Sequence, residues 1–496
     1  MALPIPKCLV SETCFRLGSN RRWITWVGSV ALLFAWHLSV RCQSAPQLSL
    51  QESDINSIAV VMPTEGSPGP PKAPVPNLLP ELLALAERNN PGLKAAYHRW
   101  QSALQKIPQV TSLEDPRLTF TDYLERTMEV AEEIRITQMI PYPGKLALRG
   151  RIESAEAEAL RKEFEKERLD LRADVKDAYY EYYYLEETVR INRENLDLLR
   201  RFERVAAARY GVGRGGNQDV IKAQVELGKV ENDVRSLEDS RAPVRARLNA
   251  AMNRPTSEPI LPPTDLDVKQ LDLHTEEVLA MSSRLNPEIQ ALDARLGKSR
   301  DQVALAQKQY FPDFSLGLNW ENGNNRMEAP PGDEYMAMVE INLPIYRKRL
   351  AAGVREAEAT VQEVQSMREE MKNKVSVDLQ NELYRLRNAE RQIHLFTDIL
   401  IPKARQSVQI TETSYSSAES GFLELVDTQR ELLMFQESYY RSVADYAQAL
   451  AKVEALVGRS LVDDGSQSIL KPADLSQSSF TDEPVEVDVT TPEQHE

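Results

Sequence analysis

Two carboxylates stand close together near the end of this chain. Glu424 and Asp427 are three residues apart, so in a helix they lie on one face. Tyr415 precedes them, and Asp219 stands at the matching place in an earlier, similar stretch. Grouped carboxylates attract cations and repel one another, which is the chemistry of an ion-selective constriction. The alternative is that Glu424 and Asp427 form an ordinary solvated helix face.

No other group of residues suggests catalysis or cofactor binding. The five histidines include no HxxxH or HxH pair, and the three cysteines all lie within the first 42 residues. We therefore predict no metal site, no cofactor and no enzymatic activity. A run of tyrosines covers more than one face of a helix and is predicted to pack between helices: Tyr179, Tyr180, Tyr182, Tyr183 and Tyr184.

The segments that hold these residues occur twice. Three pairs of anchors recur in the same order at an offset of about 200 residues. They are Asn90-Pro91 with Asn286-Pro287, Pro141 with Pro344, and Tyr210 with Tyr415. Asp219 aligns with Glu424 at the last of these offsets. The sequence therefore predicts a tandem duplication, in which each copy contains a helix, two strands, a long helix and a second helix.

Four short stretches have the character of strands. In the second copy, Phe314 to Glu321 and Tyr335 to Leu343 alternate apolar and polar residues, which predicts one apolar face. In the first copy, strands are expected over Leu118 to Leu124 and Val130 to Ile140, after a helix over Leu78 to Ile107. Trp320 and Tyr335 stand near strand ends, as aromatic girdles do in membrane barrels. The alternative is a solvated hairpin on a soluble core.

The remaining segments predict very long helices. Lys145 to Arg209 would span roughly 95–100 Å, too long for one globular core. Apolar residues recur there and around Val375 to Leu400 in steps of three and four, which predicts coiled-coil packing. Pro402 should kink or loosen the second of these helices. The predicted class is mainly α with a small antiparallel β part.

The turn between each pair of long helices should form a distant tip. The first turn, Gly211 to Asn217, includes Gly211, Gly213, Gly215 and Gly216, which allow a tight reversal at positive φ. The second turn runs from Ser416 to Gly421. The alternative is that both are ordinary helix–turn–helix links.

The ends of the chain differ from its middle. Trp23 to Val40 contains no charged residue and follows Arg21-Arg22, which predicts an export signal; a retained membrane anchor is the alternative. Cys42 raises the question of lipidation, although Arg41 fits a lipidation box poorly. The formal net charge is −15, which argues against a nucleic-acid partner.

These observations divide the chain into six parts. They are a signal peptide at 1–44, a proline-rich linker at 45–80, a first repeat at 81–254, an irregular connection at 255–274, a second repeat at 275–458 and an acidic tail at 459–496 without a folded core. Four strands cannot close a barrel, but three chains supply twelve, which can. A tube formed by three copies is therefore expected.

The chain resembles the TolC-like outer-membrane efflux proteins from about Leu78 to Val457. Three segments carry the resemblance: Gln138 to Leu146, Tyr210 to Gln224 and Tyr415 to Gln429. The Gly144-Lys145 step is similar to the heavy-metal and resistance-nodulation-division (RND) branch. The resemblance implies a homotrimeric α/β-barrel channel in outer-membrane lipid that extends into the periplasm. It also implies a periplasmic adaptor and an inner-membrane RND-type pump as partners.

The resemblance also assigns residues. It implies a periplasmic gate at Glu424, Asp427, Asp219 and Tyr415, and adaptor contacts at the tip glycines, including Gly421. One position departs from the family, because Ser420 stands where the best-known gate uses an arginine. The alternatives are a periplasmic coiled-coil adaptor or structural protein, which has no need of the strands, and a scaffold anchored in the inner membrane.

Overall fold

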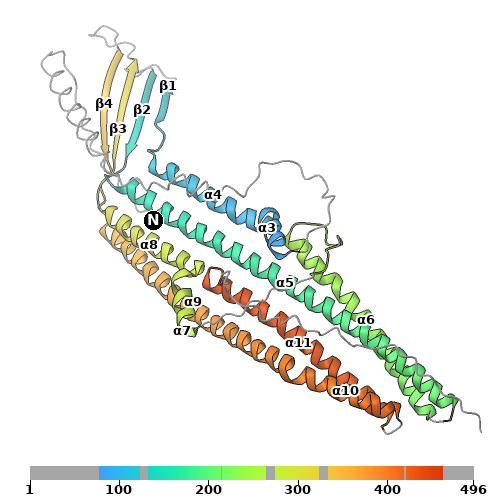
Figure 1. Cartoon of the computed structure of the whole chain (residues 1–496). Helices are drawn as coiled ribbons and strands as arrows, with labels where there is room; N and C mark the ends of the chain where they lie inside the picture. The colour runs from blue at the N-terminus through green and yellow to red at the C-terminus, as the bar shows by residue number, and fades with distance from the viewer. Residues whose placement is uncertain are drawn as a thin grey trace, which may run out of the picture.

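The protein is an elongated rod with a β-sheet at one end. A computed structural model describes residues 78–122, 132–213, 215–263, 274–322, 333–417 and 420–461. Helices run from the sheet to two hairpin tips at the opposite end (Figure 1). The predicted signal peptide, Cys42, most of the proline-rich linker and most of the acidic tail lie outside the described residues.

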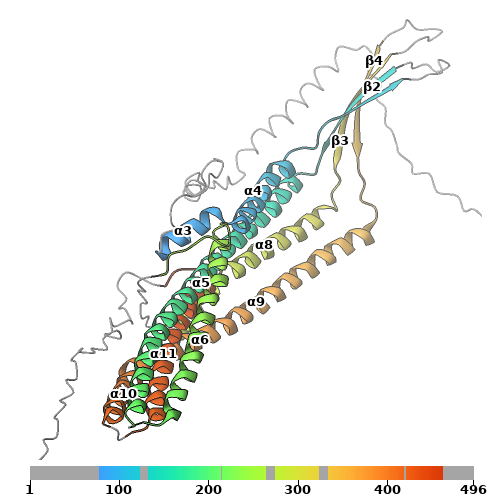
Figure 2. The same cartoon turned by 90° about the vertical axis from the view of Figure 1, so that its right-hand side faces the viewer.

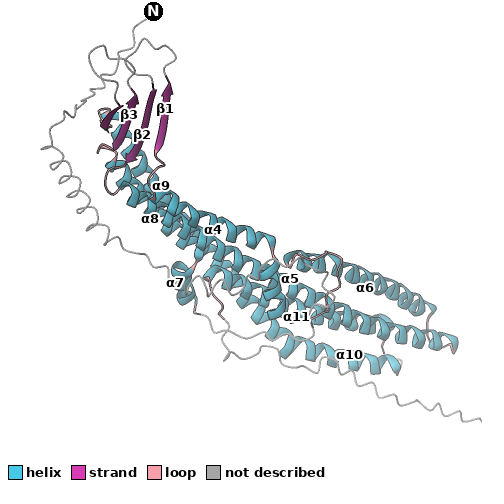
Figure 3. Cartoon of the chain, turned by 90° about the horizontal axis from the view of Figure 1, so that it is seen from above, coloured by secondary structure: helices cyan, strands magenta, loops and turns pink. Residues whose placement is uncertain are grey.

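The same order of elements occurs twice. The first half comprises α3 (Leu79–Asn89), α4 (Pro91–Thr111), β1 (Arg117–Asp122), β2 (Glu132–Ile140), α5 (Lys145–Gly211) and α6 (Asn217–Ala251). The second comprises α7 (Thr275–Leu285), α8 (Pro287–Lys308), β3 (Phe314–Asn322), β4 (Asp333–Ile341), α9 (Arg347–Leu395), the short π-helix η1 (Phe396–Leu400), α10 (Ile401–Ser416) and α11 (Phe422–Val457). The class predicted from the sequence, mainly helical with a small antiparallel sheet, is confirmed (Figure 3).

Both hairpins form one antiparallel sheet in the order β1-β2-β3-β4. The register aligns apolar residues in rows on one face, such as Leu118, Ile136 and Leu318. Trp320 pairs with Tyr335 on that face, near the end of β3 and the start of β4. These ends of the two strands lie farthest from the helices (Figure 2). The predicted alternation is therefore present. β4 ends at Ile341 rather than Leu343, because its partner strand begins opposite Ile341.

A buried lysine joins the two repeats where strands give way to helices. The Lys145 ammonium, 1% exposed as a residue, donates to Asp313 Oδ1 at 2.8 Å and to the Phe311 carbonyl at 3.1 Å. Asp313 Oδ1 also accepts from the Tyr142 N–H at 2.7 Å. Breaking a buried pair of this kind by removing one partner costs about 3–5 kcal/mol. Lys145 thus fixes the first repeat against the strand β3 of the second.

The first helix of each repeat is broken, which the sequence interpretation of one helix over Leu78 to Ile107 missed. Asn90 ends α3 and caps α4, since its side chain accepts from the Leu93 N–H at 3.0 Å. Asn286 does the same for α8. The proline that follows each asparagine has no N–H to continue the preceding helix. Each asparagine also donates to the end of its own repeat, at Ala251 O and Leu456 O.

The long helix α5 is confirmed at 67 residues, or roughly 100 Å. Its tyrosines face two different packing clusters, as predicted. Tyr179 and Tyr182 pack among residues of α3 and α6, and the Tyr182 hydroxyl donates to Ile260 O at 3.2 Å. Tyr183 packs against Tyr440 of α11, with ring centroids 6.3 Å apart. Burial raises the pKa of Tyr182 to about 12 and also raises that of Tyr183, so these two hydroxyls stay neutral.

Pro402 loosens the second long helix, as expected. Because Pro402 has no N–H for the Asp398 carbonyl, the turn before it widens. The Ile401 N–H bonds to Phe396 O, five residues earlier, which makes η1 a π-helix. The helix then continues as α10 to the second tip.

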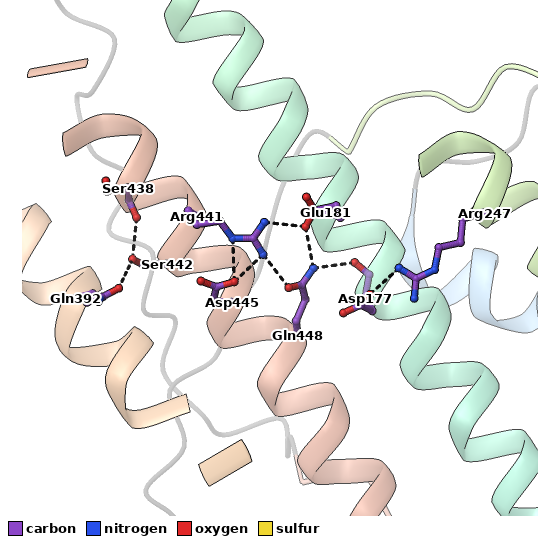
Figure 4. Close-up of polar contacts among 9 residues, drawn as sticks. All are labelled: Asp177, Glu181, Arg247, Gln392, Ser438, Arg441, Ser442, Asp445 and Gln448. Carbon is purple, nitrogen blue, oxygen red and sulfur yellow. Dashed lines mark hydrogen bonds and ion pairs between the residues drawn. The ribbon is translucent and has the colours of Figure 1, made fainter. Parts of the chain in front are cut away.

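Polar side chains link α5 to α11 halfway along the rod (Figure 4). Arg441 of α11 donates to Glu181 of α5 at 2.8 Å and to Gln448 at 2.8 Å. Gln448 in turn donates to Asp177 O at 3.1 Å. Arg441 also lies over the Tyr184 ring, 4.7 Å from its centre. These contacts fix the lengthwise alignment of the two helices. Across the part of the chain that the structure describes, no helix is both long and apolar enough to cross a membrane.

Candidate functional site at the helix tips

The two hairpin tips share one hydrophobic cluster. Leu199, Phe202 and Ala206 of α5 pack with Ala223 and Val230 of α6. Tyr415 of α10 and three residues of α11 complete the cluster: Phe422, Leu425 and Val426. The tips are thus held side by side at the end of the rod opposite the sheet (Figure 2).

The glycines of the first turn do not all serve the same purpose. Gly213 has φ of +72°, so it supplies the predicted left-handed residue. Gly211 is the last residue of α5, and Gly216 precedes α6 at φ −86°, so the expectation of positive φ is wrong for these two. It is wrong for Gly215 as well, where a Cβ would lie 3.2 Å from Arg209 Cβ, a tight contact. Gly421 precedes α11 with an extended backbone, at φ −83°.

Tyr415 is buried between the tips and is held by an arginine. The Arg209 guanidinium of α5 donates to the Tyr415 carbonyl at 2.5 Å and lies 4.6 Å from the centre of its ring. Phe422 contacts the same ring edge-on, at 5.8 Å between centroids. Burial raises the pKa of the Tyr415 hydroxyl, Arg209 lowers it, and the charge of Asp219 raises it. Asp219 and Tyr415, both predicted as site residues, are therefore electrostatic neighbours.

Asp427 belongs to a second arginine contact. Arg430 of α11 donates to Asp427 at 2.8 Å and, through two nitrogens, to both oxygens of Glu226 on α6, at 2.9 and 2.7 Å. Glu226 is only 7% exposed. Hydrogen bonding to Arg430 holds the pKa of the Glu226 carboxyl below its ordinary value of 4.5, against the opposing effect of burial. Two forked bonds between oppositely charged groups form a specific clamp between the two tips.

Glu424, unlike Asp427, has no arginine partner among the described residues. It is exposed, and no cation among the described residues pairs with its carboxylate. Its charge is therefore available to a passing ion or a second chain. Ser420, which stands where an arginine was anticipated, donates to the Thr411 carbonyl at 3.4 Å and makes no ion pair within the described part of the chain.

Sequence reasoning missed Arg209, Arg430 and Glu226. At the offset that aligns Tyr210 with Tyr415, Arg209 matches Ser414 and Arg430 matches Val225. Neither arginine recurs in the other repeat, so a comparison of the two repeats does not single them out. Their positions could have indicated a role, since Arg209 precedes an anchor tyrosine and Arg430 follows Asp427 by three residues, on the same helix face.

The sequence profile of the family described as outer membrane efflux protein matches residues 82–254 and 279–459. The chain belongs to this family. The match covers most of the described chain, including both tips and the sheet. It places the protein in the outer membrane, with its helices in the periplasm, as an efflux channel component, and it decides against the periplasmic adaptor considered from sequence.

Relatives and solved structures agree with this assignment. The cobalt-zinc-cadmium resistance protein CzcC of Cupriavidus metallidurans is 22% identical over 423 residues, which are 84% of this chain and 96% of that protein. The pyoverdine export outer membrane protein OpmQ of Pseudomonas putida is 23% identical over 59% of this chain and 62% of that protein. The structure of VceC from Vibrio cholerae has a TM-score of 0.65 at 18% identity, covering 77% of this chain and 96% of that chain. The structure of CusC has a TM-score of 0.65 at 15% identity, with 80% and 99% covered. These structures share the fold.

Proposed function

We propose that three copies of this protein form the exit duct of a tripartite efflux system. The duct passively conducts substrate that an inner-membrane RND-type pump expels through a periplasmic adaptor. The proposal includes two repeats, at 81–254 and 275–458, and adaptor contacts at the tip glycines Gly211, Gly213, Gly215, Gly216 and Gly421.

The observation that carries this proposal is the sheet. Among the described strands, β1 and β4 each pair on one side only. Unpaired strand edges are costly in lipid, and three four-stranded sheets joined edge to edge remove them. The apolar face is strongly exposed in the single chain, with Leu118 at 69% and Leu318 at 63%. Lipid would cover this face in a closed barrel of twelve strands.

The opposite face of the sheet is mostly polar, with Met336, Met338 and Gly317 as exceptions, and a polar inner face is what a water-filled channel requires. Thr119, Arg135 and Asn319 form one row across it. Glu133, Glu321 and Glu334 form the next row toward the far end. An apolar outer face and a polar inner face on the same strands support a water-filled lumen.

The tips support a gate at the other end. In a trimer, Glu424 and Asp427 would place six carboxylates around the periplasmic opening. Arg209 and Arg430 would couple the two hairpins of each subunit, while residue 420 itself is a serine. Asp219 and Tyr415 belong to this coupled unit. Rings of carboxylates bind and select cations at a narrow opening.

The relatives are named for different cargoes, metal ions in one case and pyoverdine in the other. This variety fits a duct whose cargo is chosen by the pump. No step of the proposed function requires chemistry by this chain.

The test is single-channel recording in planar bilayers. Glu424→Ala combined with Asp427→Ala should weaken cation selectivity and block by divalent cations by roughly tenfold, because the ring charge is lost. Glu356→Ala with Glu363→Ala removes the same charge from the exposed surface of α9, far from the tips, and should leave both properties unchanged. Unaltered selectivity in the tip variant would remove the gate assignment.

A further inference from the structure

A cavity of about 270 Å³ lies between the middle of α5 and the C-terminal end of α11. Four basic side chains line it: Arg168, Arg172, Lys176 and Arg459. The carboxylate of Glu454 also lines the cavity. The proposed channel function uses none of these residues, which belong to the middle of α5 and the end of α11, between the sheet and the tips (Figure 1).

The positive charges of this basic cavity are only partly balanced. Arg172 pairs with Glu87 at 2.9 Å, and Lys176 pairs with Glu454. Arg168 and Arg459 are exposed, and neither has a carboxylate partner within the described part of the chain. Within the described residues, the Arg459 side chain donates to the Met281 sulfur at 3.2 Å. Two guanidinium groups are therefore available for an anion.

The end of the described chain is fixed beside the cavity. Gly458 ends α11 with φ of +91°, and a Cβ there would lie 2.5 Å from the Leu285 carbonyl oxygen, so only glycine fits. Glu454 Oε1 then accepts from the Ser460 hydroxyl at 2.8 Å and from the Leu461 N–H at 2.9 Å. Burial by itself would raise the pKa of the Glu454 carboxyl. Lys176 and these two donors lower it by more, so the net shift is downward and the carboxylate stays charged.

The sequence that follows is acidic. Residues 462–496 contain nine acidic residues and one lysine. The first two, Asp463 and Asp464, come directly after Val462. At about 3.3–3.6 Å per residue, they are within roughly 10 Å of the anchored Leu461. Their short tether gives them a high effective concentration at the two available arginines.

We propose that Asp463 and Asp464 bind back into the basic cavity, where they pair with Arg168 of α5 and Arg459 at the end of α11. The chain would thereby link its own C-terminal segment to α5, halfway along the rod. Charge-assisted hydrogen bonds between guanidinium groups and carboxylates supply the attraction. The bound segment would extend the contact that Glu454 begins at Ser460 and Leu461.

Amide hydrogen exchange of the full-length protein in detergent, read by mass spectrometry, tests this proposal. Residues 463–466 should exchange about tenfold more slowly in the wild type than in Arg168→Glu with Arg459→Glu. Asp463→Asn with Asp464→Asn should show the same loss of protection. Two controls should retain it. They are Arg300→Glu, an exposed arginine of α8, and Asp482→Asn with Glu483→Gln, which removes the same charge from the far end of the tail.

A charge swap separates binding from a folding defect. Arg168→Glu and Arg459→Glu combined with Asp463→Lys and Asp464→Lys should restore protection, because the pairs are re-formed with reversed sign. Rapid exchange at 463–466 in the wild type would overturn the proposal, as would protection that survives neutralisation of the two aspartates. Fast exchange together with shielding of Arg168 from phenylglyoxal would show that a neighbouring subunit fills the cavity instead.

Discussion

Arg430 is the residue that most directly ties one tip to the other. Its two bonds to Glu226 cross from α11 to α6, while Asp427 holds it on its own helix. Because the pKa of Glu226 is lowered in the folded protein, the clamp stabilises the contact between the two tips fully above pH 4.5. The stabilisation is lost as the pH falls through the lower, folded-state pKa.

The lowered pKa of Glu226 predicts that the contact between the tips is lost, and the channel opens, at low pH. Channel conductance should rise when the pH is lowered below about 4.5, and Glu226→Gln should show the raised conductance already at neutral pH, because a neutral amide holds Arg430 more weakly. Bilayer recordings across this pH range measure both effects. Glu231→Gln is the matched control, since Glu231 pairs with Arg200 inside the first hairpin. A Glu226→Gln channel identical to the wild type at pH 7 would contradict the clamp.

Some features of the candidate site could be predicted from the sequence alone. The period of the α-helix placed Glu424 and Asp427 on one helix face, and the offset between the two repeats aligned Tyr210 with Tyr415. They could not show that Tyr415 is buried while Tyr210 is 50% exposed. That difference arises from how two distant hairpins pack together, which neither repeat encodes alone. The arginine contacts were missed for the same reason.

Among the elements, the lengths of the helices could be predicted from the sequence, but the positions at which helices break were harder to predict. α5 has no proline, and apolar residues recur along it in steps of three and four except at Asn192, so its extent could be predicted from the sequence. Pro402 predicted a kink or a local loosening, which takes the form of the π-helix η1. The break at Asn90-Pro91 was missed even though asparagine followed by proline is a start signal for a helix. The structure shows that this dipeptide caps α4 and also ties it to the end of α6.

The paired caps give a prediction for these elements. Asn90→Ala should lower the free energy of unfolding by about 1 kcal/mol for the lost cap, with a further loss for the bond to Ala251. Asn286→Ala should act alike, and the double variant should be additive, since the two sites lie in different repeats. Thermal unfolding followed by circular dichroism measures this. Asn90→Asp, which keeps the cap but not the donor, should lose only the second part.

For the whole molecule, the sheet is incomplete in a single chain. Successive rows of its register alternate between a mainly apolar face and a mainly polar face, and both edges are unpaired among the described strands. Helices α5 and α11 pack against each other within one chain, but other helices leave large apolar side chains exposed, such as Ile221, Tyr384 and Ile410. A single chain thus leaves apolar surface uncovered on its helices as well as on its sheet, and in the proposed channel further copies and lipid would cover it.

Two adjacent residues of the edge strand β1 test which face of the sheet meets lipid. Leu118 lies in the apolar row of Leu318, at the middle of β3, and Thr119 lies on the opposite face. Leu118→Arg should destabilise the membrane-inserted form by about 2–4 kcal/mol, because it places a charge near the middle of the lipid. Thr119→Arg adds the same side chain to the water-filled lumen and should cost little. Refolding into vesicles, followed by electrophoresis of unheated samples, should give a heat-labile trimer for wild type and Thr119→Arg and mostly monomer for Leu118→Arg. Equal trimer yields from both variants would mean that the Leu118 face does not meet lipid.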